Sequence, residues 1–354
     1  MKYNHSVLDG HYHILEGWCN HEAQDFLQST RSYLESRNFR SLNICAVPFL
    51  EECQTDVSNN ILAALCKFRM PQLYIHGGIV YDPLPLTDTL STDPAEQYRE
   101  LMEIGFDGVK MLETKPTELK RLNRSMADPL FEGWFDAIEK NGTHMVWHVA
   151  DPAHFWIREY VSQELVDRGW FYGDGTFPSR EDLYEQVLAV LERHPRLKIT
   201  FAHFLFLADE PERLEELFRR YPNVNVDITP GWEMYAAFAR DPAFWRAFFI
   251  RYADRIGFGT DSGDESCGQP DISDRVYRFL VSSEEQEIWG IRFPGLALDD
   301  DTLEQILCGN FLRRVGKQPK PIQPHALKSY IAKYLPQIAN PSLRRSIEQA
   351  AQSL

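Results

Sequence analysis

Two histidines near the N-terminus, His11 and His13, are separated by a single residue and follow a short apolar run. Residues i and i+2 of a β-strand point to the same side, so both imidazoles would lie on one face. We expect that face to carry Val7, Asp9, His11 and His13, and the other to carry Leu8, Gly10 and Tyr12. Two imidazoles at a strand end can bind one metal ion, although the pair alone is a weak signal.

Four later apolar runs each end at or near one titratable side chain. They span residues 107–112 with Lys110, 144–149 with His148, 197–203 with His203, and 255–261 with Asp261. Strand alternation puts Lys110, His148 and Asp261 on inward faces, while Val109, Met111, Met145 and Trp147 point outward to pack on helices. His76 and His144 also face inward but lie deeper, and we assign them a structural role.

The remaining strand candidates, residues 41–47, 73–80 and 224–229, bring the total to eight. Helical patterns separate most of them, at 95–104, 131–140, 183–194, 212–221 and 242–252. Alternation of strands and helices implies parallel pairing, and eight units predict an α/β fold of the (β/α)8 TIM-barrel type. The polar strand ends would then meet at the C-terminal mouth, where such barrels keep their active sites.

This ordered set resembles that of the amidohydrolase superfamily of metal-dependent barrel enzymes: His-x-His after strand one, Lys after strand four, His after strands five and six, Asp after strand eight. The resemblance covers roughly Val7 to Gly316. The segment Ile306–Leu312 is also similar, more weakly, to the segment that closes the barrel in the subgroup related to aminocarboxymuconate-semialdehyde decarboxylase.

The resemblance implies site residues and a cofactor. His11, His13 and Asp261 would bind metal, His148 would be a third imidazole ligand, and His203 would be a ligand or a proton-transfer group. Zinc suits imidazole and carboxylate donors, with one ion expected and two as the alternative. Lys110 would act either as an ammonium that binds substrate or as a carbamate that bridges two metals; we favour the ammonium.

The function expected is hydrolysis of a small molecule with a lactone, ester or amide carbonyl by metal-activated water, with Asp261, His203 and Lys110 as catalytic residues. The main alternative is a zinc-dependent decarboxylase of an aromatic or unsaturated acid, a reaction known in the same subgroup. Lys110 favours hydrolysis, because it is not part of the decarboxylase pattern. A catalytically dead metal-binding scaffold is the third reading, and the intact Asp261 argues against it.

No repeat or flexible linker divides the chain, so we expect one catalytic domain over residues 1–316 and a C-terminal helical extension over 317–354 that packs on the barrel or forms an oligomer contact. Long insertions, Asp151 to Arg180 and Ser262 to Leu298, follow strands five and eight and would shape the site. Trp232, Tyr235 and Phe238 follow strand seven, where we favour covering the barrel over stacking on a ligand.

Composition fits a cytoplasmic enzyme with a small-molecule substrate. The net charge of −15 disfavours nucleic acid and anionic membranes as partners. No apolar run is long enough to span a membrane, and the first strand begins too early to leave room for a signal peptide. The six cysteines lack zinc-finger spacing, and we expect them to be reduced and mostly buried, with Cys267 a weak candidate for substrate contact.

Overall fold

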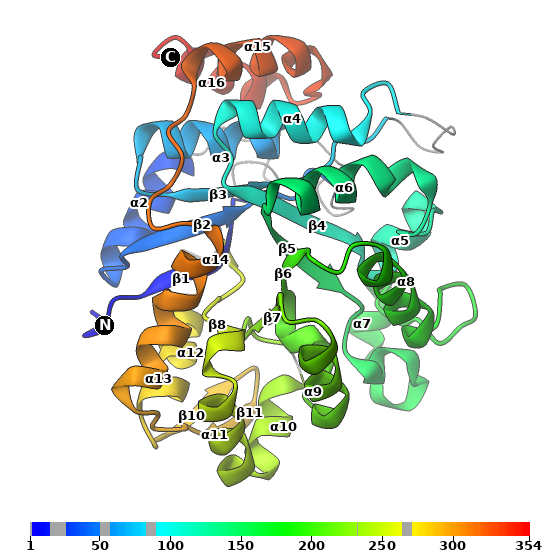
Figure 1. Ribbon diagram of the computed structural model, residues 1–354, viewed down its shortest axis with the longest axis vertical. Helices are drawn as coiled ribbons and strands as arrows, with labels where there is room; N and C mark the ends of the chain where they lie inside the picture. Colours follow the sequence, from blue (N-terminus) through cyan, green and yellow to red (C-terminus); the bar gives the residue numbers. More distant parts are fainter. Residues whose placement is uncertain (1, 15–25, 50–56, 83–89, 232, 264–270) are drawn as a thin grey trace.

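The computed structural model of this 354-residue chain describes residues 2–14, 26–49, 57–82, 90–231, 233–263 and 271–354. Strands and helices alternate along most of the described length (Figure 1). Trp232 and Cys267, for which roles were considered above, lie outside the described residues. The strands of the main sheet are β1 (Leu8–His13), β2 (Ser41–Cys45), β3 (Tyr74–Gly77), β4 (Gly108–Thr114), β5 (His144–Val149), β6 (Lys198–Phe201), β7 (Val224–Asp227), β8 (Ile256–Gly257) and β9 (Ser262–Gly263).

These strands form a closed parallel barrel. Each of the first eight pairs with its neighbour in sequence, and β9 pairs with β1. Since β8 and β9 are consecutive pieces of one segment, the sheet closes on itself through that segment. Backbone hydrogen bonds from Gly10 N to Phe258 O (3.0 Å) and from Asp261 N to His11 O (2.9 Å) complete the seam. The structure therefore confirms the predicted TIM-barrel fold.

The eighth strand differs from its predicted form. The prediction of a continuous strand over 255–261 is wrong, because β8 ends at Gly257 and β9 begins only at Ser262. Asp261 has a φ of 54°, in the left-handed region, which a regular strand does not accommodate. Because of this break, β8 pairs with β7 and β9 pairs with β1. Asp261 lies at the joint between these two short strands.

A buried carboxylate fastens this joint. Asp9 of β1 is fully buried and accepts hydrogen bonds from Thr260 Oγ1 (2.6 Å), Thr260 N (3.2 Å), His11 N (3.1 Å) and Tyr33 Oη (3.2 Å). Burial raises the pKa of Asp9 to about 7, although each of these donors opposes the rise. Four donors on one carboxylate tie β1, the eighth strand and a covering helix together.

Helices cover the outside of the barrel (Figure 1). Their ends follow local sequence signals: before α4, the Asp93 side chain accepts from Ala95 N and Glu96 N, Pro94 is the first helical residue, and Gly105 ends the helix at a φ of 111°. The described α-helices are α2 (Phe26–Ser36), α3 (Ser58–Arg69), α4 (Pro94–Ile104), α5 (Pro116–Leu122), α6 (Glu132–Asn141), α7 (Gln163–Asp167), α8 (Arg180–Arg193), α9 (Pro211–Arg220), α10 (Met234–Arg240), α11 (Pro242–Arg251), α12 (Asp271–Val281), α13 (Asp300–Glu304), α14 (Asn310–Val315), α15 (Pro324–Tyr334) and α16 (Pro341–Ala351).

Both predicted insertions contain structure of their own. The segment after β5 includes α7 and a small separate core, made of Phe155, Val161, Leu165 and Tyr172. The described part of the segment after β9 contains α12 and an antiparallel hairpin of β10 (Glu285–Ile288) and β11 (Ile291–Pro294). Tyr235 and Phe238 of α10 are buried against Phe279 of α12, which agrees with their expected covering role.

Polar side chains fill the lower barrel interior. His76 Nε2 and His144 Nδ1 are 2.8 Å apart, and His144 Nε2 is 2.9 Å from Thr200 Oγ1. Arg314 of α14 closes the floor by donating to Asn225 Oδ1 (2.9 Å) and Ile199 O (3.0 Å). These pairings occupy the inward histidines of the lower barrel, in agreement with the structural role expected for His76 and His144.

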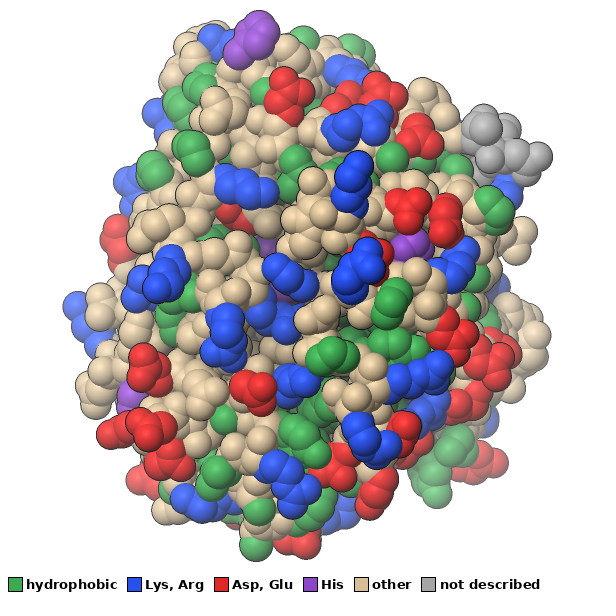
Figure 2. All heavy atoms as spheres, viewed as in Figure 1, with side chains coloured by type: hydrophobic (Ala, Val, Ile, Leu, Met, Phe, Trp, Pro, Cys, Tyr) green, Lys and Arg blue, Asp and Glu red, His purple; other side chains and the backbone are tan. Residues whose placement is uncertain are grey.

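The C-terminal helices lie beside the barrel helices α3 and α4 (Figure 1). Tyr330 of α15 is buried and accepts a hydrogen bond from Asn60 of α3 at 3.2 Å. The division at residue 316 stays a prediction. Among the described residues, no helix is long and apolar enough to cross a membrane. Lys and Arg side chains gather near the centre of the face shown in Figure 2, and most acidic side chains lie toward its edges.

Candidate metal centre

An extra residue in β1 places its two histidines at the barrel mouth. Between the positions paired with β2, β1 advances three residues, from Asp9 to Tyr12, while β2 advances two. Such a bulge reverses the alternation of side chains beyond it. Asp9 and Tyr12 consequently both contact helix α2, outside the sheet. The prediction that Asp9 shares a face with His11 and His13 is therefore wrong.

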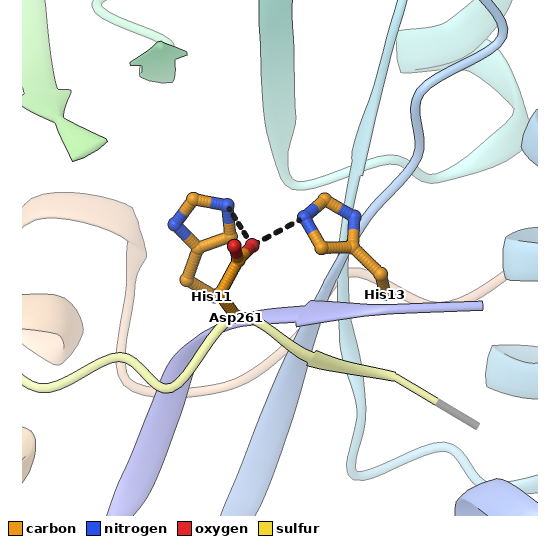
Figure 3. A group of neighbouring side chains, drawn as sticks. All are labelled: His11, His13 and Asp261. Carbon is orange, nitrogen blue, oxygen red and sulfur yellow. Dashed lines mark ion pairs between the residues drawn. The ribbon is translucent and has the colours of Figure 1, made fainter. Parts of the chain in front are cut away.

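His11, His13 and Asp261 converge on one point (Figure 3). The distance to Asp261 Oδ1 is 3.1 Å from His13 Nε2 and 3.5 Å from His11 Nε2. One potential ligand atom from each of the three residues lies within 4.8 Å of the others. The donor set of two imidazole nitrogens and one carboxylate oxygen is one that divalent transition metals bind, so these residues fit a metal site.

Hydrogen bonds on the far side of each imidazole fix its orientation. His11 Nδ1 lies 2.9 Å from Asp227 Oδ2, and His13 Nδ1 lies 2.7 Å from the carbonyl oxygen of Cys45. If Nδ1 carries the proton in both rings, each Nε2 presents its lone pair toward Asp261. In protein metal sites, the ring nitrogen of a ligating histidine that does not bind the metal usually donates a hydrogen bond to a carboxylate or a carbonyl oxygen.

Asp227 is the site residue that the sequence reasoning missed. It ends β7, is buried, and also accepts from His203 N (2.9 Å) and Thr229 N (3.1 Å). Burial opposes its ionisation, but His11, His203 and the Thr229 hydroxyl together lower its pKa. The signal was available, because Asp227 lies in the predicted strand 224–229 with the same parity as the inward Asn225.

The electrostatic environment favours neutral imidazoles and an ionised carboxylate. Burial, reinforced by the Lys110 ammonium and opposed by Asp227, lowers the pKa of His11 to about 4. Burial also disfavours the Asp261 carboxylate, but its hydrogen bond with His13 and the imidazoles of His203 and His11 outweigh that effect and hold the pKa of Asp261 well below its usual value. Neutral histidine and ionised aspartate are the forms that bind metal.

His203 stands beside this group on a strained turn. His203 follows β6 with a φ of 54°, in a run of left-handed residues that extends to Phe206. Its Nε2 is 4.0 Å from Asp261 Oδ2, its ring stacks on Phe206 at 5.1 Å, and its buried Nδ1 has no hydrogen-bond partner among the described residues. Burial lowers the pKa of His203 to about 4, so its ring is neutral near pH 7.

The structure places His148 next to His203 but outside the convergent group. Their ring centroids are 4.8 Å apart. His148 Nε2 is 2.9 Å from Ala150 O and 3.4 Å from Asp151 Oδ1. That nitrogen therefore faces the protein, and the predicted role of His148 as a metal ligand stays a prediction.

Lys110 reaches the centre from β4. Its Nζ is 2.9 Å from His11 Nε2, and the residue is 2% exposed. His11 thus lies between a cation on one nitrogen and the Asp227 carboxylate on the other. The inward direction of Lys110 agrees with the strand parity used in the sequence analysis.

A second group of potential ligands, Glu132, Asp136 and His194, lies on the outer helices. His194 is within 3.4 Å of Glu132 and 3.5 Å of Asp136. Arg193 already pairs with Glu132 at 2.6 Å. We interpret this group as an ion-pair cluster between α6 and the end of α8.

The position of Asp227 generates a prediction for metal affinity. Changing Asp227 to Asn keeps an acceptor for His11 Nδ1 but removes the negative charge, and we expect zinc to bind about 10- to 100-fold more weakly. Competition with a chromophoric chelator measures this affinity. Asp254→Asn, a change at an exposed carboxylate, is the control. Equal zinc affinity in Asp227→Asn and the unchanged protein would contradict the orienting role.

Comparisons with solved structures support the fold. An uncharacterised TIM-barrel protein from Bordetella bronchiseptica is 14% identical, with 88% of this chain and 98% of that chain covered and a TM-score of 0.55. A 2,6-dihydroxybenzoate decarboxylase is 14% identical over 89% and 99% of the two chains, with a TM-score of 0.53. A 5-carboxyvanillate decarboxylase from Sphingomonas paucimobilis is 15% identical over 88% and 98%, with a TM-score of 0.51.

Sequence comparison gives the family. A comparison with curated proteins found no match to this chain. The amidohydrolase family model matches residues 77–313, which is more than half of the chain and includes Lys110, His148, His203, Asp227 and Asp261. The matched region and the closed barrel with its polar mouth agree with the resemblance drawn from the ordered strand ends. This chain belongs to the amidohydrolase family.

Proposed function

We propose that this protein is a metal-dependent hydrolase that acts on a small molecule with a lactone, ester or amide carbonyl. The observation that carries the proposal is the position of Lys110, whose Nζ lies 2.9 Å from His11 Nε2 at the convergent group. A cation beside the convergent group can bind the carbonyl or carboxylate oxygen of a substrate and stabilise negative charge that develops during attack.

His11, His13 and Asp261 would hold the divalent ion, and zinc matches their donor set best. His148 is the fourth ligand proposed from the resemblance. A bound ion of this kind supplies Lewis acidity and lowers the pKa of a coordinated water. Asp261 and His203 are the residues proposed to transfer protons.

Asp261 is the proposed proton acceptor. Its side chain is 40% exposed, so substrate can approach it, and its lowered pKa keeps it ionised near pH 7. As water attacks the carbonyl carbon, Asp261 takes the proton from the water. A carboxylic acid with a low pKa returns its proton readily, so Asp261 then transfers it to the leaving oxygen or nitrogen.

His203 is the proposed partner in charge stabilisation. Its ring is held by the stack on Phe206 and by the hydrogen bond from its backbone N to Asp227. The neutral ring can donate a hydrogen bond to the oxygen that gains negative charge, or share proton transfer with Asp261 at 4.0 Å.

A decarboxylase of an aromatic carboxylic acid is the second candidate. Two of the similar structures are decarboxylases of hydroxylated aromatic acids by name. Their identities of 14% and 15% support a common fold, and Lys110 is the feature that favours hydrolysis here. A screen of lactones, amides and carboxylated aromatics in ¹⁸O-labelled water separates the reactions: hydrolysis puts ¹⁸O into the product, whereas decarboxylation releases carbon dioxide.

The first test concerns the metal. Replacing both His11 and His13 with Ala should abolish zinc binding and leave the fold intact, because barrel stability resides in the packed layers below the mouth. Elemental analysis gives the metal content, and circular dichroism checks the fold. His325→Ala, at an exposed histidine of α15, is the control. Full zinc occupancy in the double variant would place the site elsewhere.

The second test concerns proton transfer. Asp261→Asn should reduce turnover at least about 100-fold, the usual scale for loss of a positioned acid or base. Steady-state kinetics on the best substrate from the screen measures this. Zinc content is determined in parallel, so that a loss of metal is separated from a loss of the base. Near-normal turnover would rule out Asp261 as the proton acceptor.

The third test distinguishes the two forms of Lys110. If Lys110 is a free ammonium, Lys110→Ala should keep one metal per chain and lose a charge-assisted contact of about 1.5–3 kcal/mol, seen as a higher KM or lower kcat. Lys198→Ala, at the start of β6, is the control. Two metals per unchanged chain, falling by half in Lys110→Ala, would show instead that Lys110 is carbamylated.

A further inference from the structure

Glu233 is a glutamate at the barrel mouth whose carboxylate has no partner side chain in the part of the chain that the structure describes. It lies between β7 and α10, six residues after Asp227 in the sequence. Both carboxylate oxygens are inaccessible to solvent, and neither accepts a hydrogen bond from another described residue. Buried carboxylates in proteins are normally paired with a cation or with several donors, so this arrangement needs an explanation.

One aromatic ring, that of Phe206, lies between the Glu233 carboxylate and the histidines of the proposed active site. A Cβ placed on Gly231 would lie 3.2 Å from the Phe206 ring and 3.4 Å from Glu233 Oε2, so ring and carboxylate flank the same short stretch of backbone. The Phe206 ring stacks on His203 at 5.1 Å and lies 5.6 Å from His148. Glu233 therefore belongs to the wall beside His148 and His203.

Among the described residues, no charged group forms a hydrogen bond or ion pair with Glu233. Arg180 is the nearby cation, but its Nη1 donates to Glu210 (2.5 Å) and its Nη2 to Phe206 O (2.6 Å). Asp151 adds a like charge and is itself paired with Lys115 at 2.9 Å. Burial raises the pKa of Glu233 to about 7, opposed by its own backbone N–H and by Arg180 and reinforced by Asp151.

A site with an unused acceptor recognises a ligand that brings a donor. A hydroxyl or N–H group would satisfy the carboxylate, whereas an apolar or anionic group would leave it unpaired or repel it. The position beside His148 and His203 is where a substrate of the proposed reaction would extend. Loops and strand ends at this face of a TIM barrel supply the residues that select substrates.

We propose that Glu233 is a specificity-determining residue of the barrel mouth, and that its carboxylate accepts a hydrogen bond from a hydroxyl or N–H group of the substrate. The substrate class is thereby narrowed to small carbonyl compounds that carry such a donor away from the reacting carbon. This inference rests on the proposed function, because it assumes that substrate binds at the convergent group.

The test uses ligands that share a metal-binding group and differ in one hydroxyl. Benzohydroxamic acid and its 3-hydroxy and 4-hydroxy derivatives are titrated into the zinc-loaded full chain by calorimetry. We expect at least one hydroxy derivative to bind about 10-fold more tightly than the parent compound, the scale of a charge-assisted hydrogen bond. The preference should shrink in Glu233→Gln and vanish in Glu233→Leu, with the affinity of the parent compound unchanged.

Glu181→Gln is the matched control, because Glu181 is an exposed carboxylate of α8 that is paired with Arg213 and leaves the contacts of Arg180 in place. It should keep the preference. If neither hydroxy derivative binds more tightly than the parent, or if Glu233→Leu keeps the preference, Glu233 does not select substrate.

Urea unfolding of the metal-free chain at pH 8 gives an independent readout. Replacing a buried carboxylate that lacks a partner side chain should raise the midpoint for Glu233→Leu, whereas Glu210→Gln, which loses ion pairs with Arg180 and Arg213, should lower it. A lower midpoint for Glu233→Leu would show that the carboxylate supports the fold, and would overturn the proposal. Failure of the parent hydroxamate to bind would count against the metal centre, and the urea midpoints would still decide whether Glu233 is kept at a cost to stability.

Discussion

The seam between β1 and the eighth strand is the constraint on which the site depends. The hydrogen bond from Asp261 N to His11 O joins the two chain segments that carry the convergent side chains. Asp9, with its donors from Thr260 and Tyr33, fixes the same joint one layer below. Because the residues come from the first and last barrel strands, only a closed barrel brings them together, and any loosening of the seam would separate them.

The charges at the mouth are arranged around His11. Lys110 lies against Nε2 and Asp227 against Nδ1, so one ring joins a cation to an anion. A neutral imidazole has a single lone pair, and Lys110 cannot keep its bond to Nε2 once that nitrogen binds an ion. Metal binding would therefore release the Lys110 ammonium from His11. The ammonium would then be available to bind substrate only when the metal is present.

Backbone strain is concentrated at the same face. Ala150 after β5, His203 after β6 and Asp261 between β8 and β9 all have φ values between 54° and 63°, which cost about 1–3 kcal/mol each for residues other than glycine. Each of these positions lies where a strand meets the mouth. The sharp turns aim His203 and Asp261 at the centre, and the packed barrel below compensates for their cost.

The sequence alone determined the elements and the residues that end them. Alternating apolar runs and helical patterns predicted the barrel, and period-two parity placed Lys110 inside, because backbone geometry fixes which way a strand side chain points. Three features depended on tertiary structure: the bulge that turns His11 and His13 inward, the break at Asp261, and the positions of Asp227 and Glu233. A bulge or a break is set by pairing with strands distant in sequence, and a carboxylate behind a histidine, or one without a partner, is recognised only when its neighbours in space are known.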